Sequence, residues 1–165
     1  MIGRSLGQVH EALLEIDVGI PSFRDGLQRA ESALADDGLT AHLAVPDRDL
    51  LRTVFIDLLA ELEEFSFVEQ GLHGEPHIGN YLVTPSGLRW IDFEDACRGP
   101  LEWDLAFLPT DSVATFENVD SALLELLTTL NSARVATWCW IQARFPEMRA
   151  HGEHHLELVR ERWKL

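Results

Sequence analysis

Three oxygen-bearing side chains near the middle of the chain have the types and the order that phosphoryl transfer requires. Residues 73–80 read His-Gly-Glu-Pro-His-Ile-Gly-Asn, and Asp92 follows twelve residues after Asn80. A carboxylate such as that of Glu75 can orient or deprotonate a hydroxyl group, while an amide oxygen and a second carboxylate hold Mg²⁺ against nucleotide phosphates. This order predicts Glu75 as the base, and Asn80 and Asp92 as Mg²⁺ ligands that also bind the nucleotide.

A β-hairpin predicted between Asn80 and Asp92 would bring these two side chains together. Residues 81–84 alternate weakly in polarity, residues 85–87 (Pro-Ser-Gly) are typical of a turn, and residues 88–92 form a second extended segment. The outer ends of an antiparallel hairpin lie side by side. The metal-binding pair is therefore expected to follow from the position of the turn.

Helical periodicity dominates the rest of the chain. Apolar residues recur at helical spacing, with Asp47 and Asp120 as candidate caps and Pro146 at a helix start. Helices are expected at residues 3–17, 22–35, 47–65, 101–108, 121–130, 132–144 and 147–163, with short extended segments at 67–68 and 71–72. We expect residues 1–165 to form a single domain, mainly α-helical with a small β-hairpin, which is an α+β fold.

Charge and hydropathy exclude several function classes. The 165 residues include 28 acidic and 13 basic side chains, a formal net charge of −15, which repels nucleic acids and anionic membranes. No apolar run approaches the length of about 20 residues that a membrane span needs, and the N-terminus lacks the apolar core of a signal peptide. We expect a cytoplasmic protein that binds neither nucleic acid nor membrane, with Cys97 and Cys139 buried rather than ligating a metal.

Three sequence blocks occur in an order that matches a known family. Residues 72–82 read Leu-His-Gly-Glu-Pro-His-Ile-Gly-Asn-Tyr-Leu, residues 90–96 read Trp-Ile-Asp-Phe-Glu-Asp-Ala, and residues 99–106 read Gly-Pro-Leu-Glu-Trp-Asp-Leu-Ala. They resemble the HGDxHxxN, I-D-[FW]-x-D-A and G-[DP]-P-x-x-D-L-A motifs in the C-terminal lobe of the aminoglycoside phosphotransferase and choline kinase-like family. Residues 7–13 resemble a further family helix, so the resemblance spans about residues 3–110.

This resemblance implies a fold and an activity. The chain would be a protein kinase-like C-terminal lobe, with a catalytic loop at residues 73–80, a metal loop at 92–95 and C-terminal helices at 101–163. It would transfer the γ-phosphate of ATP to a hydroxyl group of a small molecule. The acidic composition favours a cationic acceptor, such as an aminoglycoside or an amino alcohol, but the sequence identifies neither the acceptor nor ATP over GTP.

The resemblance also assigns roles to individual side chains. Glu75 would be the catalytic base, His73 would support the catalytic loop through hydrogen bonds, and Asn80 and Asp92 would bind Mg²⁺ and, through it, ATP. Three further residues would have structural roles near the site: His77, Asp95 and Asp104.

Two features depart from the family pattern. The family has Asp at the base position, and the extra methylene of Glu75 moves the carboxylate by about 1.5 Å. A displacement of that size can cost about a hundredfold in rate. In addition, the sequence has no Gly-rich phosphate loop and no lysine before Lys164. We therefore expect the N-terminal lobe to be absent and the isolated chain to have little or no turnover, with a homodimer or a separate N-terminal lobe as possible completions.

Other interpretations stay open from the sequence alone. The same fold could serve as a non-catalytic, pseudokinase-like lobe that binds or regulates a partner. His73, Glu75 and His77 form an H-x-E-x-H cluster of the kind that binds zinc or iron, although the chain has too few strand segments for the barrel that carries such sites. A second cluster, which a solvated helix face explains, contains His151, Glu153, His154 and His155.

Overall fold

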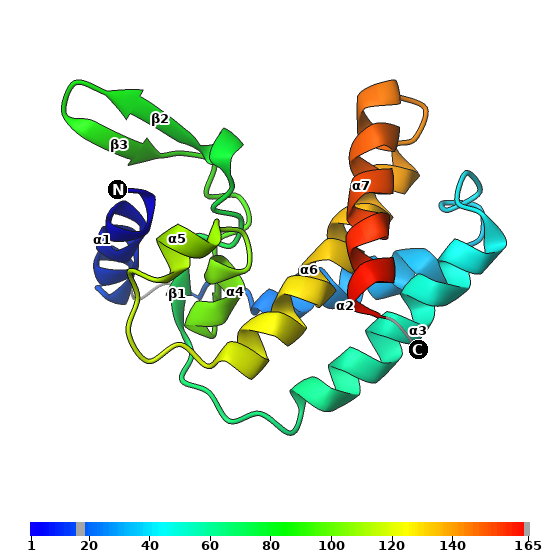
Figure 1. The fold of residues 1–165 in the computed structure, drawn as a ribbon, viewed down its shortest axis with the longest axis horizontal. Coiled ribbons are helices and arrows are strands. Elements are labelled where there is room, and N and C mark those ends of the chain that lie inside the picture. Colours follow the sequence, from blue (N-terminus) through cyan, green and yellow to red (C-terminus); the bar gives the residue numbers. More distant parts are fainter. Residues whose placement is uncertain (16–18, 164–165) are drawn as a thin grey trace. The chain divides into compact units, whose positions relative to one another are not determined.

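The protein, seen in a computed structural model that describes residues 1–15 and 19–163, is mainly α-helical with two small antiparallel sheets (Figure 1). This confirms the predicted fold class. The chain divides into two compact units, which we call the site unit (Met1–Arg24 and Phe67–Glu125) and the helical unit (Asp25–Ser66 and Leu126–Leu165). None of the described helices is long and apolar enough to cross a membrane. The expectation of a single domain stays a prediction.

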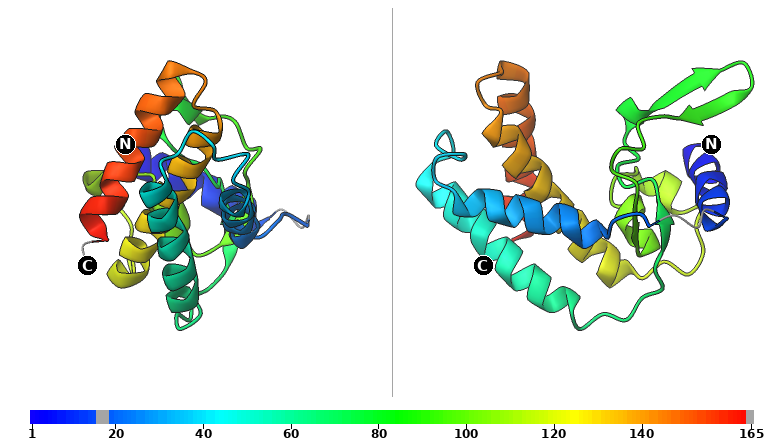
Figure 2. Two further views of the ribbon diagram at one scale, coloured as in Figure 1. Left: turned by 90° about the vertical axis from the view of Figure 1, so that its right-hand side faces the viewer. Right: turned by 180° about the vertical axis from the view of Figure 1, so that it is seen from behind.

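The predicted hairpin is present in the site unit. Strand β2 (Tyr81–Thr84) pairs with β3 (Gly87–Trp90), with Tyr81 opposite Trp90 and Thr84 opposite Gly87. The connection is two residues long rather than the predicted three, because Gly87, at φ +112°, already pairs with Thr84. Figure 2 shows β3 beside α1 (Ile2–Leu14), where Trp90 Nε1 donates a hydrogen bond to Ser5 Oγ at 3.2 Å.

A second sheet joins the segments that flank the two predicted loops. Strand β1 (Gln70–Leu72) pairs with β4 (Cys97–Gly99), with Leu72 opposite Cys97. The extended segment at 71–72 was predicted, whereas β4 was not. Strand β1 leads directly into the loop at residues 73–80, and β4 begins shortly after the loop at residues 92–95. The pairing of β1 with β4 therefore holds the start of the first loop next to the end of the second.

The helices of the site unit are short. The first, α1, ends at Leu14, and the predicted continuation to residue 17 lies outside the described residues. The predicted helix at 101–108 is shorter than expected, since α4 ends at Leu105 (Leu101–Leu105). A further short helix, α5 (Thr110–Val113), follows Pro109 and was not predicted. Asp120 caps the next helix as expected, because its Oδ1 accepts hydrogen bonds from two backbone N–H groups at 2.9 and 3.1 Å.

Four longer helices provide most of the helical unit: α2 (Phe23–Ala35), α3 (Val45–Leu62), α6 (Ser121–Ile141) and α7 (Pro146–Arg162). The predicted break in α6 at Asn131 is wrong. Asn131 is buried inside the continuous helix and its Oδ1 accepts from Arg134 Nε at 3.3 Å, and no Gly or Pro interrupts the segment. The fully buried side chains of this unit include Leu27, Leu34, Leu51, Phe55, Leu62, Leu127, Leu130 and Leu156.

The predicted start of α3 at Asp47 is also wrong. The N-cap is Ala44, and Pro46 occupies the first turn, where its missing N–H costs no helical hydrogen bond. Asp47 instead forms an ion pair with Arg160 of α7, with 2.7 Å between Asp47 Oδ1 and Arg160 Nη2. This pair and the hydrogen bond to Glu153 hold the pKa of Arg160 above its usual value.

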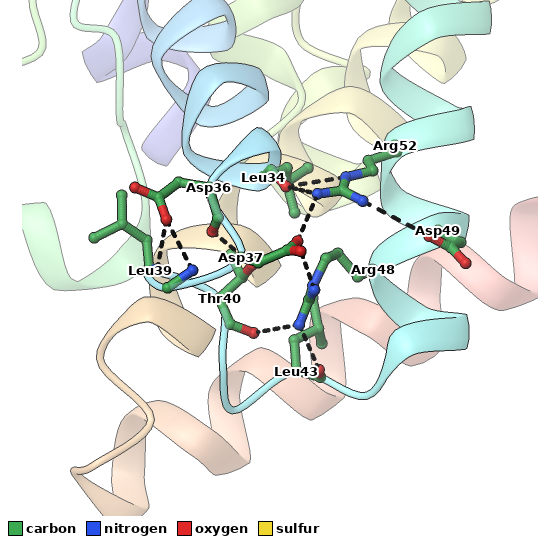
Figure 3. A network of polar contacts seen from close by, with 10 residues as sticks. Leu34, Asp36, Asp37, Leu39, Thr40, Leu43, Arg48, Asp49 and Arg52 are labelled. Atoms are coloured by element: carbon green, nitrogen blue, oxygen red, sulfur yellow. Dashed lines mark hydrogen bonds and ion pairs between the residues drawn. The ribbon is translucent and has the colours of Figure 1, made fainter.

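An exposed arginine clamp holds the connection between α2 and α3 (Figure 3). Asp37 Oδ1 lies 2.7 Å from Arg48 Nη1 and 3.1 Å from Arg52 Nη2, and Arg48 also donates to the carbonyl of Thr40 at 3.1 Å. Arg52 Nε donates to the carbonyl of Leu34 at 3.0 Å, near the C-terminus of α2. The hydrogen bond from Arg52, followed by the charge of Arg48, lowers the pKa of Asp37.

Candidate functional site

Asp104 of α4 holds the start of the loop at residues 73–80. This carboxylate is fully buried, and it accepts hydrogen bonds from the backbone N–H of His73 at 2.9 Å and of Gly74 at 2.8 Å. Asp104 Oδ2 also lies 2.7 Å from Nε2 of the buried His10, which comes from α1. The loop is thus anchored from α4, as the sequence suggested. His10 was missed, although a histidine among the apolar positions of a helix could have signalled it.

His73 connects the two predicted loops. Its imidazole is fully buried; Nδ1 accepts from the backbone N–H of Glu75 at 3.4 Å, and Nε2 lies 3.0 Å from the carbonyl oxygen of Ile91, to which it can donate. The ring also packs against Phe93, with 4.4 Å between ring centroids. His73 therefore fixes both the residue predicted as the base and the segment immediately before Asp92.

Gly74 allows the two loops to approach closely. Its φ of +88° lies in the left-handed region, and a Cβ at this position would be 1.8 Å from the carbonyl oxygen of Asp95. Only glycine combines this backbone conformation with the absence of a side chain. The Gly in the His-Gly-Glu sequence is therefore a requirement of the contact between residues 74 and 95.

The amide nitrogen of the Asn80 side chain makes a hydrogen bond within the loop, and its amide oxygen can bind a ligand. The side chain is buried, and Nδ2 donates to the carbonyl of Glu75 at 2.9 Å, so that Oδ1 is the atom left for a ligand. The backbone carbonyl of Asn80 accepts from the N–H of Ile91 at 2.9 Å. The hairpin thus places Asn80 against the residue that precedes Asp92. The pairing of the Asn80 and Asp92 side chains themselves stays a prediction.

Asp92 lies in an unusual backbone conformation at the end of this path. Its φ is +65° and its side chain is exposed. Aspartate tolerates the left-handed region better than most residues, and such positions are typical of functional loops. The conformation turns the chain sharply between β3 and Phe93, whose carbonyl accepts from the N–H of Ala96 at 3.1 Å.

The available oxygen atoms suit Mg²⁺. Asn80 Oδ1 and the Asp92 carboxylate are hard oxygen ligands, and Mg²⁺ is usually held by one or two carboxylates together with substrate phosphates and water. Among the residues described, no three His, Cys, Asp or Glu side chains form a group that could hold a metal by themselves. One amide oxygen and one carboxylate leave the other coordination positions of the ion for phosphate oxygens and water.

Known proteins resemble this chain in sequence pattern and in fold. The model of the phosphotransferase enzyme family matches residues 1–151. The chain belongs to this phosphotransferase family. No curated protein matches the sequence.

Solved structures share the fold of this family member at low sequence identity. Choline kinase LicA from Streptococcus pneumoniae is 16% identical with a TM-score of 0.74, over 98% of this chain and 61% of that one. A choline/ethanolamine kinase family protein from Mesorhizobium loti is 13% identical with a TM-score of 0.72, over 99% and 61%. Aminoglycoside 2'-phosphotransferase-IIIa is 18% identical with a TM-score of 0.61, over 97% and 62%. The chain thus spans about three fifths of each of these structures.

In this phosphotransferase-family chain, the competing zinc or iron interpretation has little support. Both ring nitrogens of His73 are engaged with the loop backbone, so His73 cannot join Glu75 and His77 in a ligand set without breaking those bonds. The second histidine cluster lies on α7, where the rings of His151 and His155 are 4.6 Å apart. Burial and the charges of its neighbours lower the pKa of His155 to about 4.

Proposed function

We propose that this chain carries the base and the metal ligands of a kinase that transfers the γ-phosphate of ATP to a hydroxyl group of a small molecule. The observation that carries the proposal is the double connection of Asn80, which bonds the carbonyl of Glu75 through its side chain and Ile91 through its backbone. One residue thereby ties the candidate base to the approach of Asp92. Family membership over residues 1–151 supports the same chemistry.

Each side chain has a separate task in the proposed reaction. Glu75 orients the acceptor hydroxyl group and accepts its proton as the hydroxyl oxygen bonds to the γ-phosphorus of ATP. The bond from the γ-phosphorus to the β–γ bridging oxygen breaks, and ADP leaves. Asn80 Oδ1 and the Asp92 carboxylate hold Mg²⁺, which when bound neutralises charge on the β- and γ-phosphates. His73 holds the backbone of Glu75 and the segment before Asp92 in position through its hydrogen bonds to the N–H of Glu75 and the carbonyl of Ile91.

The proposed acceptor is a cationic small molecule in the cytoplasm, where ATP is available. The net charge of −15 favours a positively charged acceptor over an anionic one. Similar structures are described as a choline kinase, an aminoglycoside 2'-phosphotransferase and the amicoumacin kinase hAmiN, the last with AMP-PNP and Ca²⁺. A further similar structure is described as a GDP and kanamycin complex. Choline and kanamycin are therefore suitable first acceptors to test.

A non-catalytic binding lobe is the second candidate, because apolar side chains are exposed around the site. Ile78, which follows His77 in the loop, is 81% exposed, and Val83 of β2 is also 81% exposed. Exposed apolar groups of this kind are typical of surfaces that a partner covers. A second copy of the chain or a separate N-terminal lobe would provide such cover in either function.

Magnesium-dependent ATP turnover distinguishes the two candidates. We expect the isolated chain to consume ATP only slowly in the presence of choline or kanamycin, because it lacks a Gly-rich phosphate loop and an early lysine, and the chain joined to the N-terminal lobe of a kinase of this family to be faster. In the joined chain, Asp92→Asn should lower the rate at least about a hundredfold. Glu75→Gln should lower it by about a hundredfold to ten-thousandfold, while the exposed Asp57→Asn, the same chemical change in α3, should have no effect. Absence of turnover with either acceptor, both in the isolated chain and in the chain joined to an N-terminal lobe, would favour the binding lobe.

A further inference from the structure

His77 lies where it can control the direction of the Glu75 side chain. We propose that His77 is a positioning residue that holds the Glu75 carboxylate, and that Gly79 fixes the imidazole for this task. The proposal rests on the proposed function, in which Glu75 orients the acceptor hydroxyl group. It explains how glutamate can serve at a position where the family pattern has aspartate.

The hydrogen bonds of His77 decide which ring nitrogen carries the proton. Nδ1 accepts from the backbone N–H of Gly79 at 2.9 Å, at the start of the short 3₁₀ helix η1 (Ile78–Asn80). A neutral imidazole that accepts at Nδ1 carries its proton on Nε2. Nε2 lies 3.9 Å from Glu75 Oε2, which is longer than a hydrogen bond in this structure. Such contacts in unliganded enzymes shorten when the substrate binds.

Gly79 provides both the hydrogen bond and the space for the ring. A Cβ at residue 79 would be 2.7 Å from Cε1 and 3.0 Å from Nδ1 of His77. Any other residue would displace the imidazole from its position, since real Cβ atoms do not approach that closely. The backbone carbonyl of Glu75 also accepts from the N–H of His77 at 2.9 Å, which fixes the start of the His77 side chain.

The length of the Glu75 side chain matches this arrangement. An aspartate carboxylate at residue 75 would end about 1.5 Å closer to the backbone and out of reach of Nε2. The glutamate carboxylate comes within 3.9 Å of His77 Nε2. Glutamate also has one more rotatable bond than aspartate, which spreads the carboxylate over more positions unless a neighbour restrains it. A carboxylate that is misplaced by about 1 Å can lose about a hundredfold in rate. His77 is the neighbour that we propose for this restraint, because its Nε2 lies 3.9 Å from Glu75 Oε2.

Two substitutions at residue 77 distinguish the hydrogen bond that the imidazole accepts from Gly79 from its contact with Glu75. His77→Asn keeps an acceptor for the Gly79 N–H but removes the donor that faces Glu75. His77→Gln places an amide N–H group near the position of Nε2. The exposed His42→Asn is the matched control for the chemical change.

A kinetic double-mutant cycle tests the pairing with Mg²⁺, ATP and whichever of choline or kanamycin is phosphorylated. We expect His77→Asn to lower kcat by about tenfold to a hundredfold with KM for ATP unchanged, and His77→Gln to recover most of the loss. In the Glu75→Asp background, His77→Asn should change kcat less than about twofold. Equal losses in both backgrounds would overturn the proposal, because His77 would then act on the loop alone.

A chain without turnover would contradict the proposed function but would still allow the pairing to be tested. In a chain labelled with ¹⁵N-histidine, we expect the Nε2 and Hε2 resonances of His77 to shift on Glu75→Gln, while Nδ1 of His77 and both nitrogens of His42 stay in place. Unchanged Nε2 and Hε2 resonances of His77 would overturn the proposal.

Discussion

The two units use aspartate in opposite ways. In the site unit, Asp104 is 0% exposed and accepts from two backbone N–H groups and His10. In the helical unit, the side chain of Asp37 is 74% exposed and pairs with Arg48 and Arg52 at the surface. The hydrogen bonds of Asp104 are shielded from water, whereas water and dissolved ions compete for the charged groups around Asp37.

The difference follows from the length of the secondary structure. Long helices such as α3 and α6 satisfy their own backbone groups and need mainly apolar packing. The site unit contains three-residue elements, including β1 and η1, which leave backbone N–H groups of the connecting loops without ladder partners. Asp104 satisfies two of them, so the buried polar network takes the place of regular structure.

The largest expected effect tests the buried network. Asp104→Ala leaves His10 and the N–H groups of His73 and Gly74 without their acceptor, and it should destabilise the site unit by about 3–5 kcal/mol. Urea unfolding gives the free energy, and hydrogen exchange should locate the loss at β1 and α4. The exposed Asp111→Ala serves as the control. A loss at Asp104→Ala no larger than that of the control would show that the two units do not differ as described.

Two glycines of the site unit, Gly74 and Gly87, separate the cost of a positive φ from the cost of a close contact. Gly74→Ala should cost about 2–3 kcal/mol, because the new Cβ combines a strained backbone with a clash against Asp95. Gly87 has a similar positive φ of +112° but open space around it, so Gly87→Ala should cost about 1 kcal/mol. Thermal unfolding of both variants measures the difference. Equal costs would mean that the contact between residues 74 and 95 is not tight.

An acid-sensitive group should distinguish the helical unit. The pKa of His155 falls from 6.5 to about 4, so the unfolded chain takes up the proton first. The stabilisation by neutral His155 is complete above pH 6.5 and is lost as the pH falls through 4. For this half-buried ring we expect a loss of about 1–2 kcal/mol after solvent screening. The charged groups that face it are His151, His154, Arg134 and Arg162.

Unfolding of wild type and His155→Leu across this pH range measures that contribution. The wild type should lose about 1–2 kcal/mol of stability relative to His155→Leu as the pH falls from 6.5 through 4. The exposed His42→Leu should keep a constant difference from wild type. A constant difference for His155→Leu would show that the ring is not protected from protonation.

The exposed arginine clamp should give the smallest effect. We expect Asp37→Asn to change the unfolding midpoint less than any variant above, and the change should disappear in molar salt, because the Asp37 side chain in both pairs is 74% exposed. Urea titrations at low and high salt measure it. A change that is as large as that of Asp104→Ala, and insensitive to salt, would remove the contrast between the units.

Local patterns explain what the sequence could predict. The hairpin follows from a Pro-Ser-Gly turn between two extended segments, and Asn80 meets Ile91 as a direct consequence. The missed features depend on contacts between distant residues. Strand β4 is visible only through its pairing with β1, and His10 lies 94 residues from Asp104. The wrong break in α6 came from Asn131, whose low helix propensity is overridden by burial.

The central claim is that Glu75, Asn80 and Asp92 form one metal-nucleotide site. Paramagnetic Mn²⁺ in place of Mg²⁺ tests it most directly, because NMR signals broaden near the bound ion whether or not the chain turns over. With ATP present, we predict that amide signals of residues 75–80 and 91–95 broaden together, and that Asp92→Asn abolishes this while Asp57→Asn does not. Broadening confined to one of the two segments, or found instead at residues 151–155, would contradict the account.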